Sequence, residues 1–268
     1  MIFHAGGLGD LVNTAPAISA LRARFPQSRI TLAGTGAFSP LFSAAGLADR
    51  TLSLDSHGLH ELWNEAPLSP AVKELISDHE LAVSWVRSEQ LLDRLRRLGL
   101  RVAALSGPFP PPAGSGHISE FMAGPLRELG IEDPMPPPRL MLSSAALAEG
   151  PRFSGVILHP GSGSRRKNWP AQHFVRVGEL LHQETGLELA LVCGPADAEM
   201  VNAVTAGLGP IVKAVFSGLS IVSLAALLAG ARLFMGNDSG VSHLAGAVGA
   251  PVVAVYGPTD PAAWEVRQ

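Results

Sequence analysis

Cysteine, charge and long apolar runs are all scarce in this chain of 268 residues. The single cysteine, Cys193, excludes an internal disulfide and a metal cluster built from several thiolates. It ends an apolar run, which predicts a thiol in the core. Charged residues make up 16% of the chain and the formal net charge is −3, so composition gives no support for binding nucleic acid or an anionic membrane. Any anion site must therefore be local.

No apolar run reaches the roughly 18 residues that a membrane-spanning helix needs. The N-terminal stretch MIFHAGGLGD has no basic region and reaches glycine almost at once, which is not typical of a signal peptide. We therefore expect a soluble, cytoplasmic protein. Its length is sufficient for two compact domains, each with a core of its own.

Short β-like runs alternate with helical patterns, which predicts parallel sheets with crossover helices. In the first half we expect strands at 1–4, 30–33, 51–54, 81–86 and 102–105, and helices at 11–25, 38–45, 88–98 and 118–129. Pro16 falls inside the first of these helices, which predicts a kink there or a start near Thr14. In the second half we expect strands at 156–159, 187–193, 211–215, 231–235 and 252–256, and helices at 171–184, 196–206, 220–228 and 241–248.

The stretch DPMPPPR at residues 133–139 has few backbone donors and cannot continue a helix or a central strand. It predicts a proline-rich linker region at 133–152, between an N-terminal domain at 1–132 and a C-terminal domain at 153–268. The fold class is α/β, with a doubly wound parallel sheet in each domain. Ligands of such sheets bind outside the carboxyl ends of the strands.

The stretch GNDSGVSHLAGAVGAPVVAVYGPTD at residues 236–260 joins an expected strand to a helix of small residues. The first N–H groups of such a helix lack intrahelical partners, so they can hold phosphate oxygens. Acid and serine side chains can cap the helix, glycine allows close approach, and a histidine one turn later could reach a phosphate or a ribose. The alternative is an ordinary capped turn with a packed histidine. The candidate binding residues here are Asn237, Asp238, Ser239, Gly240 and His243.

A second loop, HPGSGSRRKNWP at residues 159–170, combines glycine and serine with three basic side chains. Loop N–H groups and an ammonium group together form a diphosphate site. The candidate residues are Ser162, Gly163, Arg166 and Lys167, and a solvated basic turn is the alternative.

The stretch GPADAE follows Cys193 and contributes Gly194 and two acids. Asp197 or Glu199 could accept hydrogen bonds from ribose hydroxyls. Equally, they could be acids that are favoured in the first turn of a helix.

A third glycine loop, AGGLGD at residues 5–10, lies near the N-terminus. It is not the dinucleotide-binding fingerprint, because the third glycine is missing and no acid ends the next strand. Asp10, which follows Gly9 at a helix N-terminus, could be a general base that the helix dipole keeps ionised. An ordinary N-cap is the alternative.

Taken in order, four stretches resemble glycosyltransferase family 9, the ADP-heptose:lipopolysaccharide heptosyltransferases. They are GGLGDLVNTAPAISALRARFP, HISEFMAGPLRELGI, HPGSGSRRKNWP and GNDSGVSHLAGAVGAPVVAVYGPTDP. The resemblance implies a GT-B fold of two Rossmann-like domains, with the nucleotide sugar on the C-terminal domain and the acceptor on the N-terminal one. It also implies inversion at the sugar carbon without a metal, and the absence of any Asp-Xaa-Asp motif agrees. By the resemblance, Asp10 stands in the place of the general base, Lys167 in that of the phosphate-binding lysine, and Asp238, Ser239, Gly240 and His243 in the diphosphate loop.

The resemblance implies an inverting, metal-independent glycosyltransferase, which would need no cofactor. The resemblance implies heptose as the sugar, ADP-heptose as the donor, and the lipopolysaccharide core or another glycan or glycolipid as the acceptor. Such an acceptor allows a peripheral contact with the inner membrane, whereas nucleic acid is not expected as a partner. Two alternatives remain, a nucleotide-sugar epimerase of the same architecture and a nucleotide-sugar binding protein without turnover.

Overall fold

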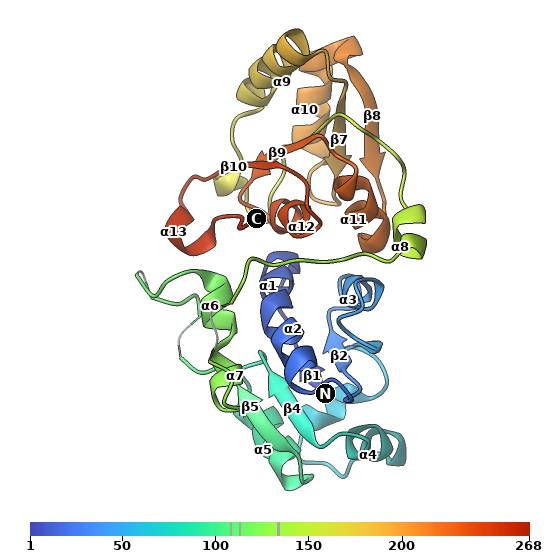
Figure 1. The fold of residues 1–268 in the computed structure, drawn as a ribbon, viewed down its shortest axis with the longest axis vertical. Helices are drawn as coiled ribbons and strands as arrows, with labels where there is room; N and C mark the ends of the chain where they lie inside the picture. The colour runs from blue at the N-terminus through green and yellow to red at the C-terminus, as the bar shows by residue number, and fades with distance from the viewer. Residues whose placement is uncertain (108, 113, 133–134) are drawn as a thin grey trace. The chain divides into compact units, whose positions relative to one another are not determined.

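Two five-stranded parallel sheets organise the chain in the computed structural model (Figure 1). The structure describes residues 1–107, 109–112, 114–132 and 135–268. The chain divides into two compact units, Met1–Pro136 and Pro137–Gln268, and each unit holds one of the sheets. Asp133 and Pro134, the first two residues of the predicted linker, lie outside the described residues.

The sheet of the first unit has the strand order β3-β2-β1-β4-β5, and all of its pairings are parallel. Its strands are β1 (Ile2–Phe3), β2 (Thr31–Gly34), β3 (Arg50–Ser53), β4 (Leu81–Ser84) and β5 (Arg101–Ala104). Its helices are α1 (Leu8–Asn13), α2 (Ala15–Arg24), α3 (Pro40–Ala44), the 3-10 helix η1 (Leu59–Trp63), α4 (Pro70–Ser77), α5 (Glu89–Arg97), α6 (Ile118–Met122) and α7 (Gly124–Arg127). The apolar faces of η1, α4 and α5 bury Leu59, Ile76 and Leu91 in one cluster with Phe3 of β1.

Thr14 divides the first predicted helix into α1 and α2. Its N–H and its hydroxyl both donate to the carbonyl of Leu11, at 3.1 and 2.6 Å, so α1 ends there. Pro16 then stands in the first turn of α2, where its missing N–H removes no intrahelical bond. The predicted start near Thr14 is confirmed. The additional helix α1 carries Asp10.

The prediction of one helix at 118–129 is wrong, because the segment forms α6 and α7. The N–H of Ala123 donates back to Ser119 and Glu120, and Pro125 follows in the first turn of α7. Proline cannot donate the hydrogen bond that would continue α6. The apolar patterns also fail to predict η1 and α4. Ser69, which caps α4 by accepting from Val72 N–H at 3.4 Å, is a signal in the sequence that would have found that helix.

The sheet of the second unit has the order β10-β9-β6-β7-β8, again with every pairing parallel. Its strands are β6 (Val156–His159), β7 (Leu189–Cys193), β8 (Val212–Ser217), β9 (Leu233–Asn237) and β10 (Val252–Val255). Its helices are α8 (Ser144–Ala148), η2 (Arg165–Lys167), α9 (Ala171–Thr185), α10 (Ala198–Leu208), η3 (Gly209–Ile211), α11 (Ile221–Ala229), α12 (Gly240–Ala247) and α13 (Pro261–Trp264). The predicted doubly wound arrangement is confirmed for both sheets.

Right-handed crossovers place α9 and α10 on one face of this sheet and α11 and α12 on the other. The contacts agree, because α9 packs against α10 and α11 packs against α12 (Figure 1). Phe174 of α9 and Leu208 of α10 join Leu158 and Leu191 of the sheet in the core. The chain adds β7 and β8 on one side of β6, and then β9 and β10 on the other side. The edge beyond the carboxyl ends of β6 and β9 is therefore the expected ligand position.

Candidate functional site

Three loops of the second unit meet at this edge, because β6 lies between β7 and β9 in the sheet. The strands are parallel, so their carboxyl ends share the edge. His159 ends β6, Cys193 ends β7 and Asn237 ends β9. The loops that follow, the last residue of β9 and the first turns of α10 and α12 carry the candidate residues that the sequence placed in this half of the chain.

Asn237 fastens the loop after β6 to the end of β9. Its side chain is fully buried, and its amide Nδ2 donates to the carbonyl of Pro160 at 2.7 Å. Its Oδ1 accepts the backbone N–H of Trp169 at 2.9 Å. Both ends of the amide are thus used by the protein. Asn237 shapes the loop at 160–169, and nothing in this arrangement gives its side chain to a ligand.

The N-terminus of α12 opens at the same edge. Ser239 is the N-cap, and its Oγ accepts the N–H of Ser242 at 3.3 Å. Among the described residues, none accepts a hydrogen bond from the N–H groups of Gly240 and Val241. Two backbone donors and the positive end of the helix dipole are therefore available for an anion.

Lys167 and Asp238 form an ion pair beside this helix terminus. The Nζ of Lys167 lies 2.7 Å from Oδ2 of Asp238. The Asp238 side chain is 4% exposed, whereas that of Lys167 is 33% exposed. The ammonium group is therefore anchored on a buried carboxylate and still reaches solvent, as a group that binds phosphate must.

Asp197 is buried behind the loop after β7, immediately before α10. Its Oδ2 lies 3.0 Å from Nε2 of His159 and accepts the N–H of Gly194 at 3.0 Å. The hydrogen bond from His159 is the largest cause of a lowered pKa of the Asp197 carboxyl, with burial opposing it. The carboxylate is ionised and faces the protein.

The remaining candidates of this half lie on the outside of the loops or inside α12. Ser162 donates to the carbonyl of Ser164 and to Oδ1 of Asn168, both at 2.7 Å, and so shapes its own turn. Glu199 is exposed and pairs with Arg165 at 2.5 Å. Gly163 and Arg166 are exposed, whereas His243 is buried in the first turn of α12.

Cys193 was expected in the core. The structure places it half-buried at the end of β7, with its Sγ 3.5 Å from the carbonyl of Gly194. Burial, with a smaller effect from Asp197, raises the pKa of its thiol, so the thiolate is disfavoured there.

In the first unit, Asp10 lies at the third position of α1. Its Oδ2 accepts the N–H of Gly7, the N-cap residue, at 3.1 Å. A carboxylate in the first turn of a helix that accepts a backbone N–H is favoured in its ionised form. Gly9 precedes Asp10, and its carbonyl accepts a hydrogen bond from Nδ2 of Asn13 at 2.8 Å.

His4 is a neighbour of Asp10 that the sequence patterns did not single out. It is 2% exposed, and burial lowers its pKa to about 4. Its Nδ1 accepts the N–H of Gly6 at 3.3 Å. A Cβ on Gly6 would come within 2.9 Å of both the Asp10 carboxylate and the His4 ring, so the loop requires glycine there. The signal for His4 is a histidine that follows a buried strand directly.

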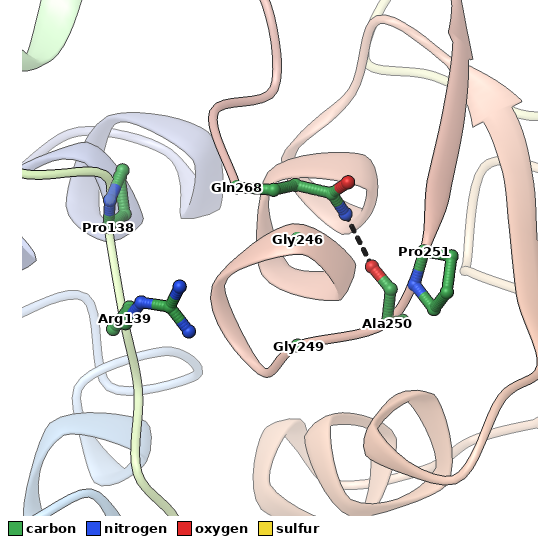
Figure 2. Close-up of a pocket in the computed structure, with 7 residues that line it drawn as sticks. All are labelled: Pro138, Arg139, Gly246, Gly249, Ala250, Pro251 and Gln268. Carbon is green, nitrogen blue, oxygen red and sulfur yellow. Dashed lines mark hydrogen bonds between the residues drawn. The ribbon is translucent and has the colours of Figure 1, made fainter.

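A cavity of 230 Å³ lies elsewhere on the second unit (Figure 2). It is lined by Pro138, Arg139, Gly246, Gly249, Ala250, Pro251 and Gln268. These residues surround the end of α12 and the approach to β10, which is the amino edge of the sheet. The cavity is therefore separate from the strand-end loops.

Within the described ranges, no three His, Cys, Asp or Glu side chains gather in a way that could hold a metal ion. Of the helices that the structure describes, none combines the length and the apolar character that crossing a membrane requires.

The family model described as "Glycosyltransferase family 9 (heptosyltransferase)" matches residues 96–266, which is more than half of the chain. This chain belongs to glycosyltransferase family 9. It is accordingly a glycosyltransferase, as the four sequence stretches predicted. The match includes Lys167 and the loop before α12, whereas Asp10 lies outside it.

Similar proteins agree with the family. Lipopolysaccharide heptosyltransferase 1 of Escherichia coli K12 is 24% identical over 97% of this chain and 88% of its own length. The structure of a family 9 glycosyltransferase from Veillonella parvula matches with a TM-score of 0.78, at 21% identity, over 99% of this chain and 82% of that one. The structure of E. coli ADP-heptose lipopolysaccharide heptosyltransferase II matches with a TM-score of 0.77, at 19% identity, over 100% of this chain and 88% of that one. The predicted GT-B fold is confirmed.

Proposed function

We propose that this family 9 glycosyltransferase moves a heptose from ADP-heptose to the lipopolysaccharide core or a similar glycan acceptor, with inversion and without a metal. The proposal is based on two features at the point where the strand order reverses. The Lys167 ammonium pairs with Asp238, and the N-terminus of α12 begins directly after that residue. The names of the relatives supply the sugar and the nucleotide, because one is an ADP-heptose heptosyltransferase.

The donor diphosphate would bind to the N–H groups of Gly240 and Val241 and to the Lys167 ammonium. As the bond between the anomeric carbon and the phosphate oxygen breaks, negative charge develops on the departing ADP. Fixed donors and a cation stabilise such charge more than they stabilise the bound donor, and this lowers the barrier. No metal is needed for that role, although other transferases use one.

For the ribose hydroxyls, the contacts favour Glu199 over Asp197. Glu199 is exposed and pairs with Arg165, which is exposed as well, so its carboxylate can exchange that partner for a ligand. Asp197 is 8% exposed and already accepts from His159 and Gly194.

Asp10 would act as the general base. It would take the proton of the acceptor hydroxyl while that oxygen forms a bond to the anomeric carbon, and ADP would leave with the electron pair of the broken bond. Single displacement of this kind inverts the configuration. Gly7 N–H holds the carboxylate in place without protonating it.

Product analysis tests the proposal. The purified protein is incubated with ADP-heptose and a heptose-deficient lipopolysaccharide core, with and without a chelator. The products are then identified by mass spectrometry and NMR. A new glycoside of inverted configuration, formed equally with chelator, is expected. An isomerised donor formed without acceptor would instead support an epimerase, and an unchanged donor that binds tightly would support a binding protein. If the acceptor is a glycolipid, the protein would contact the membrane surface during transfer.

A further inference from the structure

The buried side chain of His159, at the end of β6, connects the loops that follow β7 and β9. Its ring is 3% exposed and lies between the loops after β7 and β9. Nε2 lies 3.0 Å from Oδ2 of Asp197, and Nδ1 lies 3.4 Å from Oγ of Ser239. Since the ionised Asp197 can only accept, Nε2 carries a hydrogen. One side chain from the central strand thus contacts both neighbouring loops.

The backbone closes around the Asp197 carboxylate. Gly194 N–H donates to Oδ2, and a Cβ on Gly161 would fall 1.9 Å from Oδ1. Gly161 is itself in the loop after β6, so this loop packs directly on the carboxylate. Such an approach excludes a ribose from that side of Asp197. It also fixes the loop that leads to Lys167.

The contacts continue from His159 into the N-terminus of α12. Ser239 Oγ accepts the N–H of Ser242 and lies 3.1 Å from Ser242 Oγ. Ser242 Oγ in turn donates to the carbonyl of Asn237 at 2.5 Å. Every member of this chain of contacts is buried. The position of the α12 N-terminus is therefore coupled to the imidazole–carboxylate pair.

A buried histidine and aspartate are costly compared with well-packed apolar side chains, and a sheet edge does not require them for folding. His159 and Asp197 lie between loops and not between the helices and the sheet, so their burial needs an explanation other than folding. We propose that His159 and Asp197 are positioning residues for the donor: without touching it, they hold the loop of Lys167 and the N-terminus of α12 in the arrangement that binds a nucleoside diphosphate. This inference rests on the proposed function, which puts the diphosphate at that edge.

The test compares ADP with adenosine, because only ADP carries the diphosphate. Calorimetry on the full chain gives both dissociation constants for the wild type, Asp197→Asn, His159→Leu and His159→Gln. His182→Leu is the matched control: His182 also makes a ring hydrogen bond, to the carbonyl of Leu187 at 2.8 Å, but at the opposite edge of the same sheet. The melting temperature of each variant is measured in the same preparation.

We expect Asp197→Asn and His159→Leu to raise the dissociation constant of ADP by about 5- to 30-fold, which is less than the 10- to 150-fold effect of losing a direct contact to a charged ligand, because the pair acts only through the loops. Adenosine binding should change less than about twofold, and His182→Leu should leave both ligands alone. His159→Gln should recover part of the ADP affinity, because the glutamine amide can stand where Nε2 stands and donate to Asp197.

Two results overturn the inference. ADP affinity of the wild-type value in folded Asp197→Asn and His159→Gln would show that the pair does not position the diphosphate site. Parallel weakening of ADP and adenosine would make Asp197 a ribose ligand. If His159→Leu does not fold, the two conservative variants decide. A wild-type protein that binds no ADP at all would instead refute the proposed function, which is a distinguishable outcome.

Discussion

Lys167 offers the sharpest single test of the donor site, because its ammonium is held 2.7 Å from a carboxylate that is 4% exposed. If the proposed function holds, Lys167→Ala removes one charge-assisted contact to the diphosphate. Such a contact contributes about 1.5 to 3 kcal/mol, which is about 10- to 150-fold in the dissociation constant. In the proposed binding mode the nucleoside does not contact the ammonium, so adenosine affinity should stay within about twofold of the wild-type value.

The buried partner adds a second effect. Without the lysine, Asp238 faces the phosphates as an uncompensated negative charge. A carboxylate and a phosphate about 6 Å apart repel by about 3 kcal/mol at an effective dielectric constant of about 20, and solvent near the loop reduces this figure. Lys167→Ala should therefore weaken ADP binding by more than the lost contact alone, on the order of 10² to 10⁴-fold in total.

A double-mutant cycle separates the two effects. Asp238→Asn removes the charge but keeps the shape, so Lys167→Ala/Asp238→Asn should bind ADP more tightly than Lys167→Ala and return to about the 10- to 150-fold loss of the contact. Calorimetry with ADP and adenosine measures all four proteins at one ionic strength. Equal weakening of the two ligands by Lys167→Ala, or a double variant no better than the single one, would refute the assignment of Lys167 to the phosphates.

Three further outcomes are expected. Asp10→Asn should lower the transfer rate by about 10² to 10⁴-fold with donor affinity unchanged, and an active variant would leave Asp10 only as a helix cap. Gly161→Ala should lower the melting temperature and weaken ADP binding, because its Cβ meets the Asp197 carboxylate at 1.9 Å, whereas Gly163→Ala, with open space around its Cβ, should leave the melting temperature unchanged. His4, whose pKa falls from the usual 6.5 to about 4 on folding, takes up its proton in the unfolded chain first. His4 should therefore contribute a drop in the unfolding free energy of about 1.4 kcal/mol per pH unit between pH 6.5 and about 4, and urea titrations of His4→Asn should show a slope that is smaller by that amount.

Local patterns were sufficient for most of the fold. The apolar runs became parallel strands, and the signal is clearest in the central strands β2 and β6, which are buried on both faces and must therefore be apolar. The patterns failed where proline divides a helical segment, as at Pro125, and where the helix is short, as in α4. In such segments the apolar pattern covers only about one turn, as with Val72, Leu75 and Ile76 in α4, and capping residues are the more specific signal.

In the candidate site, too, the positions of some residues follow from local patterns and those of others do not. Lys167, Gly240 and Ser239 stand where the loop patterns put them, because backbone geometry at a strand-to-helix junction is a local property. Asn237 was predicted as a binding residue, yet both ends of its side-chain amide are engaged by loop backbone groups. Which of two neighbouring polar residues faces the ligand depends on contacts between loops that lie far apart in the sequence.

Asp197 illustrates where that limit lies. The doubly wound order alone makes the loop after β6 the neighbour of the loops after β7 and β9, so the sequence could already pair the region of His159 with those of Asp197 and Ser239. Topology does not decide whether the Asp197 carboxylate turns outward to a ribose or inward to His159. The inward orientation depends on the absence of a Cβ at Gly161 and on the backbone N–H of Gly194, which donates to the carboxylate. Both glycines belong to loops in which the sequence predicted ligand-binding residues. At this edge, the same residue type that lets a phosphate come close also lets the protein close on its own carboxylate, and only the three-dimensional arrangement distinguishes the two uses.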